Sequence, residues 1–554
     1  MADPLLRLAL HEAAAALARG DAANAEAAAR RALAVDAADA DALNLLGLAR
    51  FKGGDRAGAI AALQAAVAAR PGYRNAWDNL VAMLDADGRP ADAARAAARA
   101  VDAAPPATPD RLCAAGGRAF AAGLLPLAAS LVERAHAADP SHRRALHHLA
   151  VVRDAQRRPQ EARLLIERAL AAPGADATER AAFAAIWSKA TAADDLSRAL
   201  AEALRVLEAD PGHPGARDCA AIVLGKLGRR ADAVAMARAA LRIAPAHADV
   251  RYTLARLLEE DGALAEAAAV LAAPEAPADA RLARLAGTLH LRCGEPGAAV
   301  EALARALQLA PEDQSAIAQR GLALALVGRT AAARDWLGTA RFVARVRLVA
   351  PPGFADATAF NRALAHDIRH HSRLRFEPLG LAARGGFLTE DLMADRTPAI
   401  VGFEQALRTA IEAYVAALPD DPEHPFLRAV PRGAYGLNLW ATRVAEQGVI
   451  DTHIHEESWL SGAYYVELPP AVREDATAGW IEFGRPHRGL PEPAPDDITC
   501  QRPEVGTLLL FPSYLYHRTL PFAGAGERIS ISFDLAPSAV DPMGEQRSRP
   551  HRPR

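Results

Sequence analysis

A regular spacing of glycine and proline over the first three-fifths of the chain is the feature that most limits the folds open to it. Gly20, Gly54 and Gly88 are spaced 34 residues apart, and the prolines follow nearly the same interval. Each glycine ends an apolar helical pattern and each proline follows a second one, so the repeating unit is a helix, a tight turn, a helix and a stop. The glycines are Gly20, Gly54, Gly88, Gly123, Gly228, Gly262, Gly294 and Gly328, and the prolines are Pro71, Pro105, Pro140, Pro211, Pro245, Pro277 and Pro311. The spacing predicts about nine stacked helix pairs ending near residue 340, with an irregular pair around 172–200.

These helix pairs resemble tetratricopeptide repeats. Small residues after the turn let two helices approach closely, and larger apolar residues fill the gap between neighbouring pairs. The matching positions are Leu43, Leu46, Gly47, Gly54, Ala59, Leu63, Ala66 and Pro71 in one repeat, and Trp77, Leu80, Leu84, Gly88, Ala93, Ala97, Ala100 and Pro105 in the next. The resemblance implies an all-α solenoid over residues 1–345, whose concave groove binds a protein or peptide partner.

The last third of the chain changes character. After residue 352 the alanine-rich periodicity fades, and aromatic, glycine and β-branched residues increase. Two helical stretches, at about 358–371 and 398–417, precede short strand-like runs separated by proline and glycine turns. The runs are 435–444, 459–468, 479–483, 507–512 and 528–535. They predict a jelly roll (double-stranded β-helix) with flanking helices over residues 346–538, followed by a disordered tail at 539–554.

Charge and composition narrow the range of partners. The chain has 64 Lys and Arg against 67 Asp and Glu, a formal net charge of -3, which argues against nucleic acid or an anionic membrane as an obligate partner. The apolar stretch near the start lacks a basic leader and is interrupted by Arg7, His11 and Glu12, so we expect neither a signal peptide nor a membrane span. The expected location is therefore cytoplasmic.

Two histidine clusters about sixty residues apart lie among the strand-like runs. His453, His455 and Glu457 alternate in one segment, and His517 follows in a distant one. Because residues i and i+2 of a strand project to the same side, the first three side chains can face one cavity that His517 completes. Two histidines and one carboxylate hold Fe(II) on one face and leave the other face for cosubstrate and dioxygen. Spacing alone does not decide which two of the first three residues join His517.

Arg528 lies eleven residues beyond His517, about one strand and one turn further along the chain. If it projects into the same barrel, its guanidinium can hold a carboxylate of a bound ligand through two hydrogen bonds. The Ser530 hydroxyl would then be a second donor on the same strand face. The alternative is an arginine on the surface of an edge strand.

Several motifs over residues 350–537, taken in order, resemble a family of 2-oxoglutarate/Fe(II)-dependent oxygenases whose members often carry N-terminal tetratricopeptide repeats. They are Asn438-Leu-Trp440, His453-Ile-His455, Trp459 to Val466, Gly506, Phe511-Pro512-Ser513, His517, and Glu527 to Phe533. This family shows His-x-His without an acid two residues later, so the resemblance favours His453, His455 and His517 as iron ligands. The wider superfamily's His-x-Asp/Glu motif would select His455 and Glu457 instead. The resemblance also implies Arg528 and Ser530 as the cosubstrate-binding pair.

On this resemblance we expect an Fe(II)- and 2-oxoglutarate-dependent dioxygenase that hydroxylates a protein or peptide recruited by the repeats. A repeat array buries its own hydrophobic faces between neighbouring pairs, so we also expect the repeats to need no packing partner beyond residue 345. One alternative function is a scaffold whose barrel is catalytically silent.

A second alternative is a cupin-type metalloprotein. Gly506, Pro512 and His517 fit the second cupin motif, with Tyr514 in place of the usual inner glycine. Arg528 argues against this alternative, because a cupin needs no clamp for a cosubstrate carboxylate.

Overall fold

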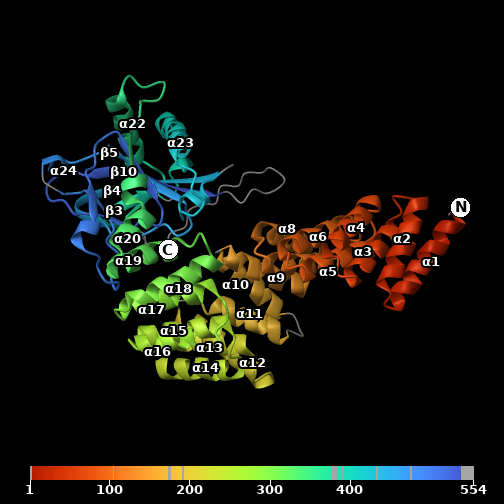
Figure 1. The fold of residues 1–554 in the computed structure, drawn as a ribbon. Helices are drawn as coiled ribbons and strands as arrows, with labels where there is room; N and C mark the ends of the chain where they lie inside the picture. The colour runs from red at the N-terminus through yellow and green to blue at the C-terminus, as the bar shows by residue number, and fades with distance from the viewer. Residues whose placement is uncertain are drawn as a thin grey trace. The chain divides into compact units, whose positions relative to one another are not determined.

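A computed structural model of the chain describes residues 3–103, 105–156, 158–171, 176–189, 192–376, 383–389, 391–431, 435–474 and 477–537. The tail expected at 539–554 lies outside the described residues. The chain divides into two compact units, Met1–Ile243 and Ala244–Arg554, each of which can be followed in Figure 1.

The first unit consists of paired helices. They are α1 (Pro4–Ala18), α2 (Ala22–Val35), α3 (Ala40–Lys52), α4 (Arg56–Ala69), α5 (Arg74–Ala86), α6 (Pro90–Ala103), α7 (Pro109–Ala121), α8 (Leu125–Ala138), α9 (Arg143–Ala155), α10 (Pro159–Ala171), α11 (Ala177–Trp187), α12 (Ala193–Ala209), α13 (Pro214–Lys226) and α14 (Arg230–Ile243). Gly54 ends the first helix of its pair with φ of 88°, a left-handed conformation that favours glycine. At Gly47 a Cβ atom would lie 2.7 Å from Leu63 Cγ, so this glycine lets α3 and α4 approach. The sequence pattern therefore marks both the turns and the closest helix contacts.

The repeats continue into the second unit with α15 (Ala248–Glu260), α16 (Leu264–Ala272), α17 (Ala280–Arg292), α18 (Pro296–Leu309), α19 (Gln314–Leu326) and α20 (Thr330–Leu337). Among the described residues α1 to α20 make ten pairs, so the expected count of about nine is too low by one. The segment between Gly123 and Gly228 carries no regular glycine to mark its pairs. The irregular pair expected around 172–200 is α11 and α12, of 11 and 17 residues.

The remainder of the second unit is a two-sheet sandwich with flanking helices (Figure 1). Its helices are α21 (Thr339–Phe342), α22 (Ala357–Arg369), α23 (Pro398–Ala417) and α24 (Pro470–Glu474). Its strands are β1 (Ala344–Arg347), β2 (Leu374–Phe376), β3 (Ala383–Thr389), β4 (Tyr435–Ile450), β5 (Leu460–Glu467), β6 (Ile481–Phe483), β7 (Thr499–Gln501), β8 (Thr507–Pro512), β9 (His517–Thr519) and β10 (Arg528–Pro537). The large sheet has the order β1-β8-β5-β10-β4-β3-β2 and the small sheet the order β7-β6-β9, with antiparallel neighbours throughout. The predicted solenoid and jelly roll are confirmed.

The two faces of the large sheet differ in polarity. Tyr464, which pairs with Ile531 of β10, donates a 2.7 Å hydrogen bond to Asn361 of α22 and packs against Phe403 of α23. Side chains alternate along a strand, so the odd-numbered apolar residues of β10 face these helices. The even-numbered residues face the interior of the sandwich. These are Arg528, Ser530, Ser532 and Asp534.

One hydrophobic core runs through the second unit from the last repeats into the sandwich. Phe342, at the end of α21, is 1% exposed, and its ring centroid lies 5.0 Å from that of Phe426. Tyr514 donates a hydrogen bond of 3.0 Å to the carbonyl of Leu337 in α20. The expectation that the repeats need no packing partner is therefore wrong for the last pairs, whose buried residues continue into those of the sandwich.

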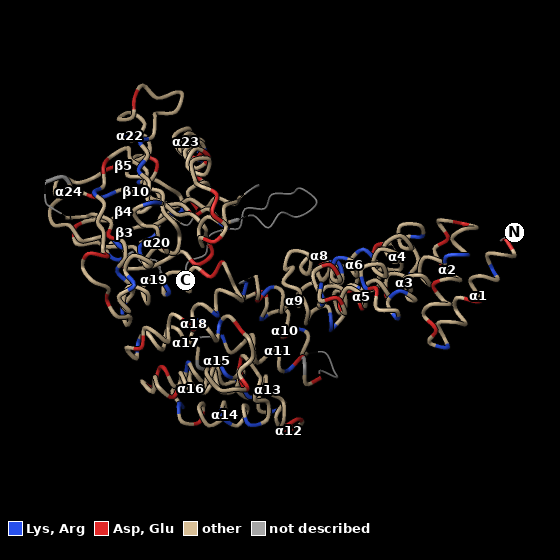
Figure 2. The backbone as a smooth tube through the Cα atoms, in the orientation of Figure 1, with Lys and Arg blue, Asp and Glu red and all other residues tan. Residues whose placement is uncertain are grey.

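Acidic and basic residues, which are nearly equal in number in the sequence, are mixed along the structure. Figure 2 shows acidic and basic positions interspersed along the helices of both units. Within the described ranges, no helix combines the length and apolar character that crossing a bilayer requires.

Candidate metal centre

The structure brings His453, His455 and His517 together. Each offers one ring nitrogen, and these three atoms lie within 4.8 Å of one another. His453 and His517 form an antiparallel bridge in which each backbone N–H donates to the other's carbonyl at 3.1 Å. The Nε2 atoms of His455 and His517 are 3.3 Å apart. β4 ends at Ile450, so the first two histidines lie just after a strand, and this bridge holds His453.

All three rings use Nδ1 for a hydrogen bond to an oxygen acceptor. An acceptor at Nδ1 requires the proton there, which leaves the Nε2 lone pair available. Such an outer partner is the usual device for orienting a metal-binding imidazole. The acceptors are the Asp451 carbonyl for His453 at 2.8 Å, the Asp534 carboxylate for His455 at 3.0 Å and the Leu515 carbonyl for His517 at 2.9 Å.

The surroundings of His517 favour a neutral imidazole at that residue. Burial lowers the pKa of His517 well below its usual value, and the neighbouring His453 and His455 lower it further. The ring of Phe511 packs against His517 with centroids 4.8 Å apart, which keeps water from this side of the ring. A neutral imidazole is the form that binds a metal ion.

Glu457 is not one of the residues of this cluster. It is exposed, and the metal-competent group found among the described residues contains the three histidines and not Glu457. The Asp534 carboxylate contacts the cluster through His455.

Arg528 lies inside the sandwich and not on its surface. It is 2% exposed, and its guanidinium donates long hydrogen bonds to the Gly479 carbonyl at 3.3 Å and the Thr519 hydroxyl at 3.4 Å. Its Nε has no hydrogen-bond partner in the described part of the chain. Burial lowers the pKa of Arg528. No ion pair of Arg528 is present among the residues that the structure describes, so this buried cation lacks an acidic partner.

Hydroxyl groups surround Arg528 on the same interior face. Ser530 of β10 pairs in register with Thr442 of β4 and Tyr465 of β5, and the three are 5%, 3% and 3% exposed. Burial raises the pKa of Tyr465 to about 12, against the smaller opposing effect of the Arg528 charge. Thr519, which accepts from Arg528, lies two residues beyond His517 on β9, so both face the same side of that strand. The guanidinium and the histidines therefore line one interior.

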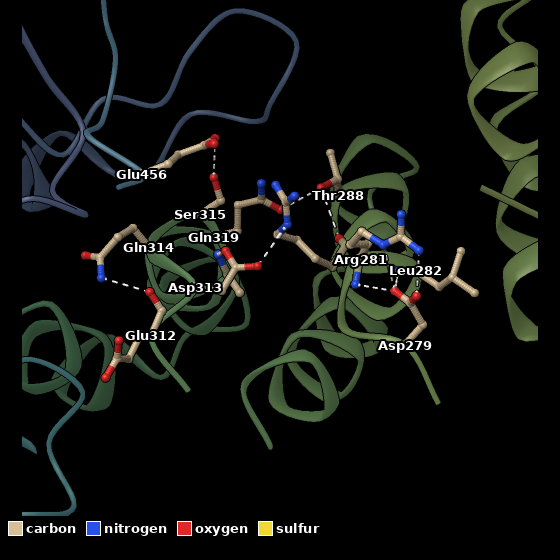
Figure 3. Close-up of polar contacts among 12 residues, drawn as sticks. Asp279, Arg281, Leu282, Thr288, Glu312, Asp313, Gln314, Ser315, Gln319 and Glu456 are labelled. Atoms are coloured by element: carbon tan, nitrogen blue, oxygen red, sulfur yellow. Dashed lines mark hydrogen bonds and ion pairs between the residues drawn. The ribbon is translucent and has the colours of Figure 1, made fainter. Parts of the chain in front are cut away.

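The last repeats reach the segment that carries two of the histidines. Figure 3 shows Glu456 pointing to Ser315 of α19, whose hydroxyl donates to the Glu456 carboxylate at 2.8 Å. Beside this contact, Thr288 of α17 donates to Gln319 at 2.7 Å. Ser315 and Gln319 are 5% and 4% exposed. A buried polar residue of the repeat helices thus contacts Glu456, the residue that follows His455 in the chain.

Sequence reasoning missed the residues that support the histidines, namely Asp534, Ser461 and Ser513. One signal could have found Asp534. Polar residues alternate with apolar ones along 528–535, so Asp534 shares a face with Arg528. The two serines lie within motifs of the family resemblance, but nothing in the sequence marks them as supports of the histidines, because their contacts join segments distant in the chain.

Comparisons with known proteins agree with this architecture. Residues 438–534 match the family model described as "Putative 2OG-Fe(II) oxygenase", and residues 10–74 and 220–280 match that of the tetratricopeptide repeat. A comparison with curated proteins finds no match.

Among solved structures, the chain is similar to one in the APC/C hetero-tetramer Cut9-Hcn1 at 16% identity, with 44% of this chain and 48% of that chain covered and a TM-score of 0.31. It thus spans about half the length of that relative. A tetratricopeptide repeat protein from Parabacteroides merdae is 13% identical, with 58% of this chain and 100% of that chain covered and a TM-score of 0.28. The family models thus identify tetratricopeptide repeats in the N-terminal region, and they match residues 438–534 to a 2OG-Fe(II) oxygenase domain.

Proposed function

We propose that the C-terminal domain is an Fe(II)- and 2-oxoglutarate-dependent dioxygenase. In this proposal His453, His455 and His517 bind the iron, and Arg528 and Ser530 bind the distal carboxylate of the cosubstrate. One observation carries this proposal: three clustered imidazoles line the same interior as a buried guanidinium. Among the described residues this guanidinium has no acidic partner.

The residues present fit both groups. Neutral imidazole nitrogens suit Fe(II), and the outer hydrogen bond of each ring holds it in the tautomer that can bind a metal. A carboxylate at Arg528 would neutralise its charge and give the unpartnered Nε an acceptor. When bound, the iron and 2-oxoglutarate would supply the oxidising chemistry together with dioxygen, which would convert 2-oxoglutarate to succinate and carbon dioxide and leave its second oxygen atom for the substrate. The chain's own residues orient the two groups, and the packed rings around His517 exclude water.

The proposed substrate is a protein or peptide, with hydroxylation of a side chain as the outcome. Stacked repeats leave a concave surface suited to an extended polypeptide. The contact between Ser315 of α19 and Glu456, the residue after His455, supports delivery of that polypeptide by the last repeats.

Cosubstrate turnover tests the enzymatic part of the proposal. The purified chain with Fe(II) should release succinate from 2-oxoglutarate, and Arg528→Lys should weaken the apparent affinity for 2-oxoglutarate about tenfold or more while metal stays bound. Arg518→Lys is a matched control, because Arg518 pairs with Glu482 at 2.6 Å. Unchanged 2-oxoglutarate affinity in Arg528→Lys would show that Arg528 is structural.

Fractionated cell extract tests the substrate class. Succinate release by the whole chain should rise when the protein fraction is added, and digestion of that fraction with a protease that is then inactivated should alter or remove the stimulation. The small-molecule fraction is the control. Stimulation by the small molecules alone would refute a polypeptide substrate without refuting the dioxygenase.

A further inference from the structure

We propose that Asp534 is a positioning residue that supplies, from one hydrogen bond away, the negative charge that a site of three histidines lacks. This inference rests on the proposed function, because it requires a divalent metal ion at His453, His455 and His517.

Asp534 is buried and both of its carboxylate oxygens are engaged. It is 4% exposed, and Oδ2 accepts from Nδ1 of His455 at 3.0 Å. Oδ1 accepts from the Ser461 hydroxyl at 2.7 Å, and Ser461 is in turn 2.7 Å from the Ser513 hydroxyl. The two serines are 1% and 0% exposed, so water does not screen this carboxylate from the inside of the sandwich.

The same group of residues holds His455 from a second side. The backbone N–H of His455 donates to the Ser513 carbonyl at 3.0 Å, while Ser513 N–H donates to the Trp459 carbonyl at 3.1 Å. The ring and the backbone of His455 are thus anchored independently. Loss of the Asp534 charge alone leaves the backbone anchor in place.

The inner face of β10 has opposite charges at its two ends. Arg528 and Asp534 are six positions apart, which corresponds to roughly 20 Å between their Cα atoms in an extended strand. Each is bonded to other groups, so they do not neutralise one another.

The charges of a loaded site would balance only with Asp534 included. Fe(II) carries two positive charges and 2-oxoglutarate two negative ones, so the positive charge of Arg528 is matched by the negative charge of Asp534. An uncompensated charge in a buried site is energetically unfavourable, so a loaded site with no net charge is favoured. In a site with two histidines and one carboxylate the acid binds the metal directly. Here its charge would act through His455.

If Asp534 acts through its charge, its loss should change the affinities for the metal ion and for 2-oxoglutarate in opposite directions. Removing the negative charge should weaken binding of the cation and strengthen binding of the dianionic cosubstrate. A residue that merely orients His455 would weaken both.

Asp534→Asn makes this change with little alteration of shape. Its amide oxygen can still accept from His455, and its NH2 group can donate to Ser461. We would measure Mn(II) affinity by calorimetry, and then 2-oxoglutarate affinity of the Mn(II)-loaded protein, with no turnover needed. Mn(II) affinity should fall about tenfold to a hundredfold. Affinity for 2-oxoglutarate should rise about fourfold to fifteenfold, as expected for unit charges roughly 10 Å apart at an effective dielectric constant of about 20 to 40.

Two further variants complete the test. Asp497→Asn removes a carboxylate that pairs with Arg334 and should leave both affinities unchanged. Ser461→Ala keeps the Asp534 charge and removes one hydrogen bond, so it should weaken Mn(II) binding less than Asp534→Asn and should not strengthen 2-oxoglutarate binding. Thermal unfolding of the metal-free variants checks that each is folded.

The outcomes separate the inference from the proposed function. If both affinities fall in Asp534→Asn, or neither changes, the charge has no such role. If Ser461→Ala reproduces both effects of Asp534→Asn, hydrogen bonding and not charge is responsible. If the unmodified chain binds no Mn(II), the metal centre itself is wrong and the inference fails with it.

Discussion

Replacing Arg528 by methionine should make the ligand-free protein more stable and at the same time abolish its response to 2-oxoglutarate. Arg528 is buried, its Nε has no partner, and its two hydrogen bonds are long, at 3.3 and 3.4 Å. Methionine keeps an unbranched side chain and removes the charge. The substitution therefore isolates the energetic effect of an unpaired buried cation.

The expected change in the free energy of unfolding follows from these contacts. A buried charge without a partner destabilises a protein by roughly 3–5 kcal/mol, and two long hydrogen bonds to neutral acceptors return about 1 kcal/mol each. Thr519 still accepts from Ile450 N–H at 2.8 Å in the variant, so its hydroxyl oxygen keeps a donor. The free energy of unfolding should rise by roughly 1–3 kcal/mol. With 2-oxoglutarate at a thousandfold excess over Kd the unmodified protein should gain about 4.1 kcal/mol and the variant nothing, so the order of stability should reverse.

Urea unfolding of the metal-free protein measures the first effect, and urea unfolding of the Mn(II)-loaded protein with and without 2-oxoglutarate measures the second. Arg518→Met is the control, because Arg518 is paired with Glu482 and its loss should slightly destabilise the protein under both conditions. The reasoning would be refuted if Arg528→Met lowered the stability of the ligand-free protein and 2-oxoglutarate still stabilised it. Arg528 would then be a structural residue.

Three further predictions concern the shared core and the buried histidine. Phe342→Ala should lower the free energy of unfolding of the second unit by about 3–5 kcal/mol, and Phe120→Ala, which removes a 37% exposed ring, should cost less; urea unfolding compares them. A chain beginning at residue 244 should give a cooperative unfolding transition, whereas one beginning at residue 345 should not, because it lacks the α17–α21 part of the core; calorimetry distinguishes the two. Burial lowers the pKa of His517, so the unfolded chain takes up a proton there at a higher pH than the folded chain does. The stabilisation that His517 gives the metal-free protein should therefore be fully present above about pH 6.5. The free energy of unfolding should decrease as the pH falls below this value, by up to about 1.4 kcal/mol per pH unit. Urea unfolding at a series of pH values should show a flatter pH profile for His517→Asn than for the unmodified protein.

Much of the candidate site was predictable because its signals are local. The His453-x-His455 and Arg528-x-Ser530 spacings match the two-residue period of a strand, and they predicted that these side chains share one interior. Sequence alone left Glu457 open as a ligand. Whether that side chain turns inward depends on the chain path after β4, where the His453–His517 bridge forms and Glu457 is exposed.

The sequence by itself determined the solenoid, the order of the two architectures and the face of β10 that carries polar groups, because glycine spacing and strand alternation act over a few residues. Gly54 illustrates this, since its backbone must turn with positive φ wherever the repeat is placed. Only the tertiary structure decided that Asp534 supports His455, 79 residues away in the chain, and that the core of the last repeats continues through Phe342 into the sandwich. Such contacts depend on which distant strands and helices are packed together, and no periodicity within a single segment encodes that choice.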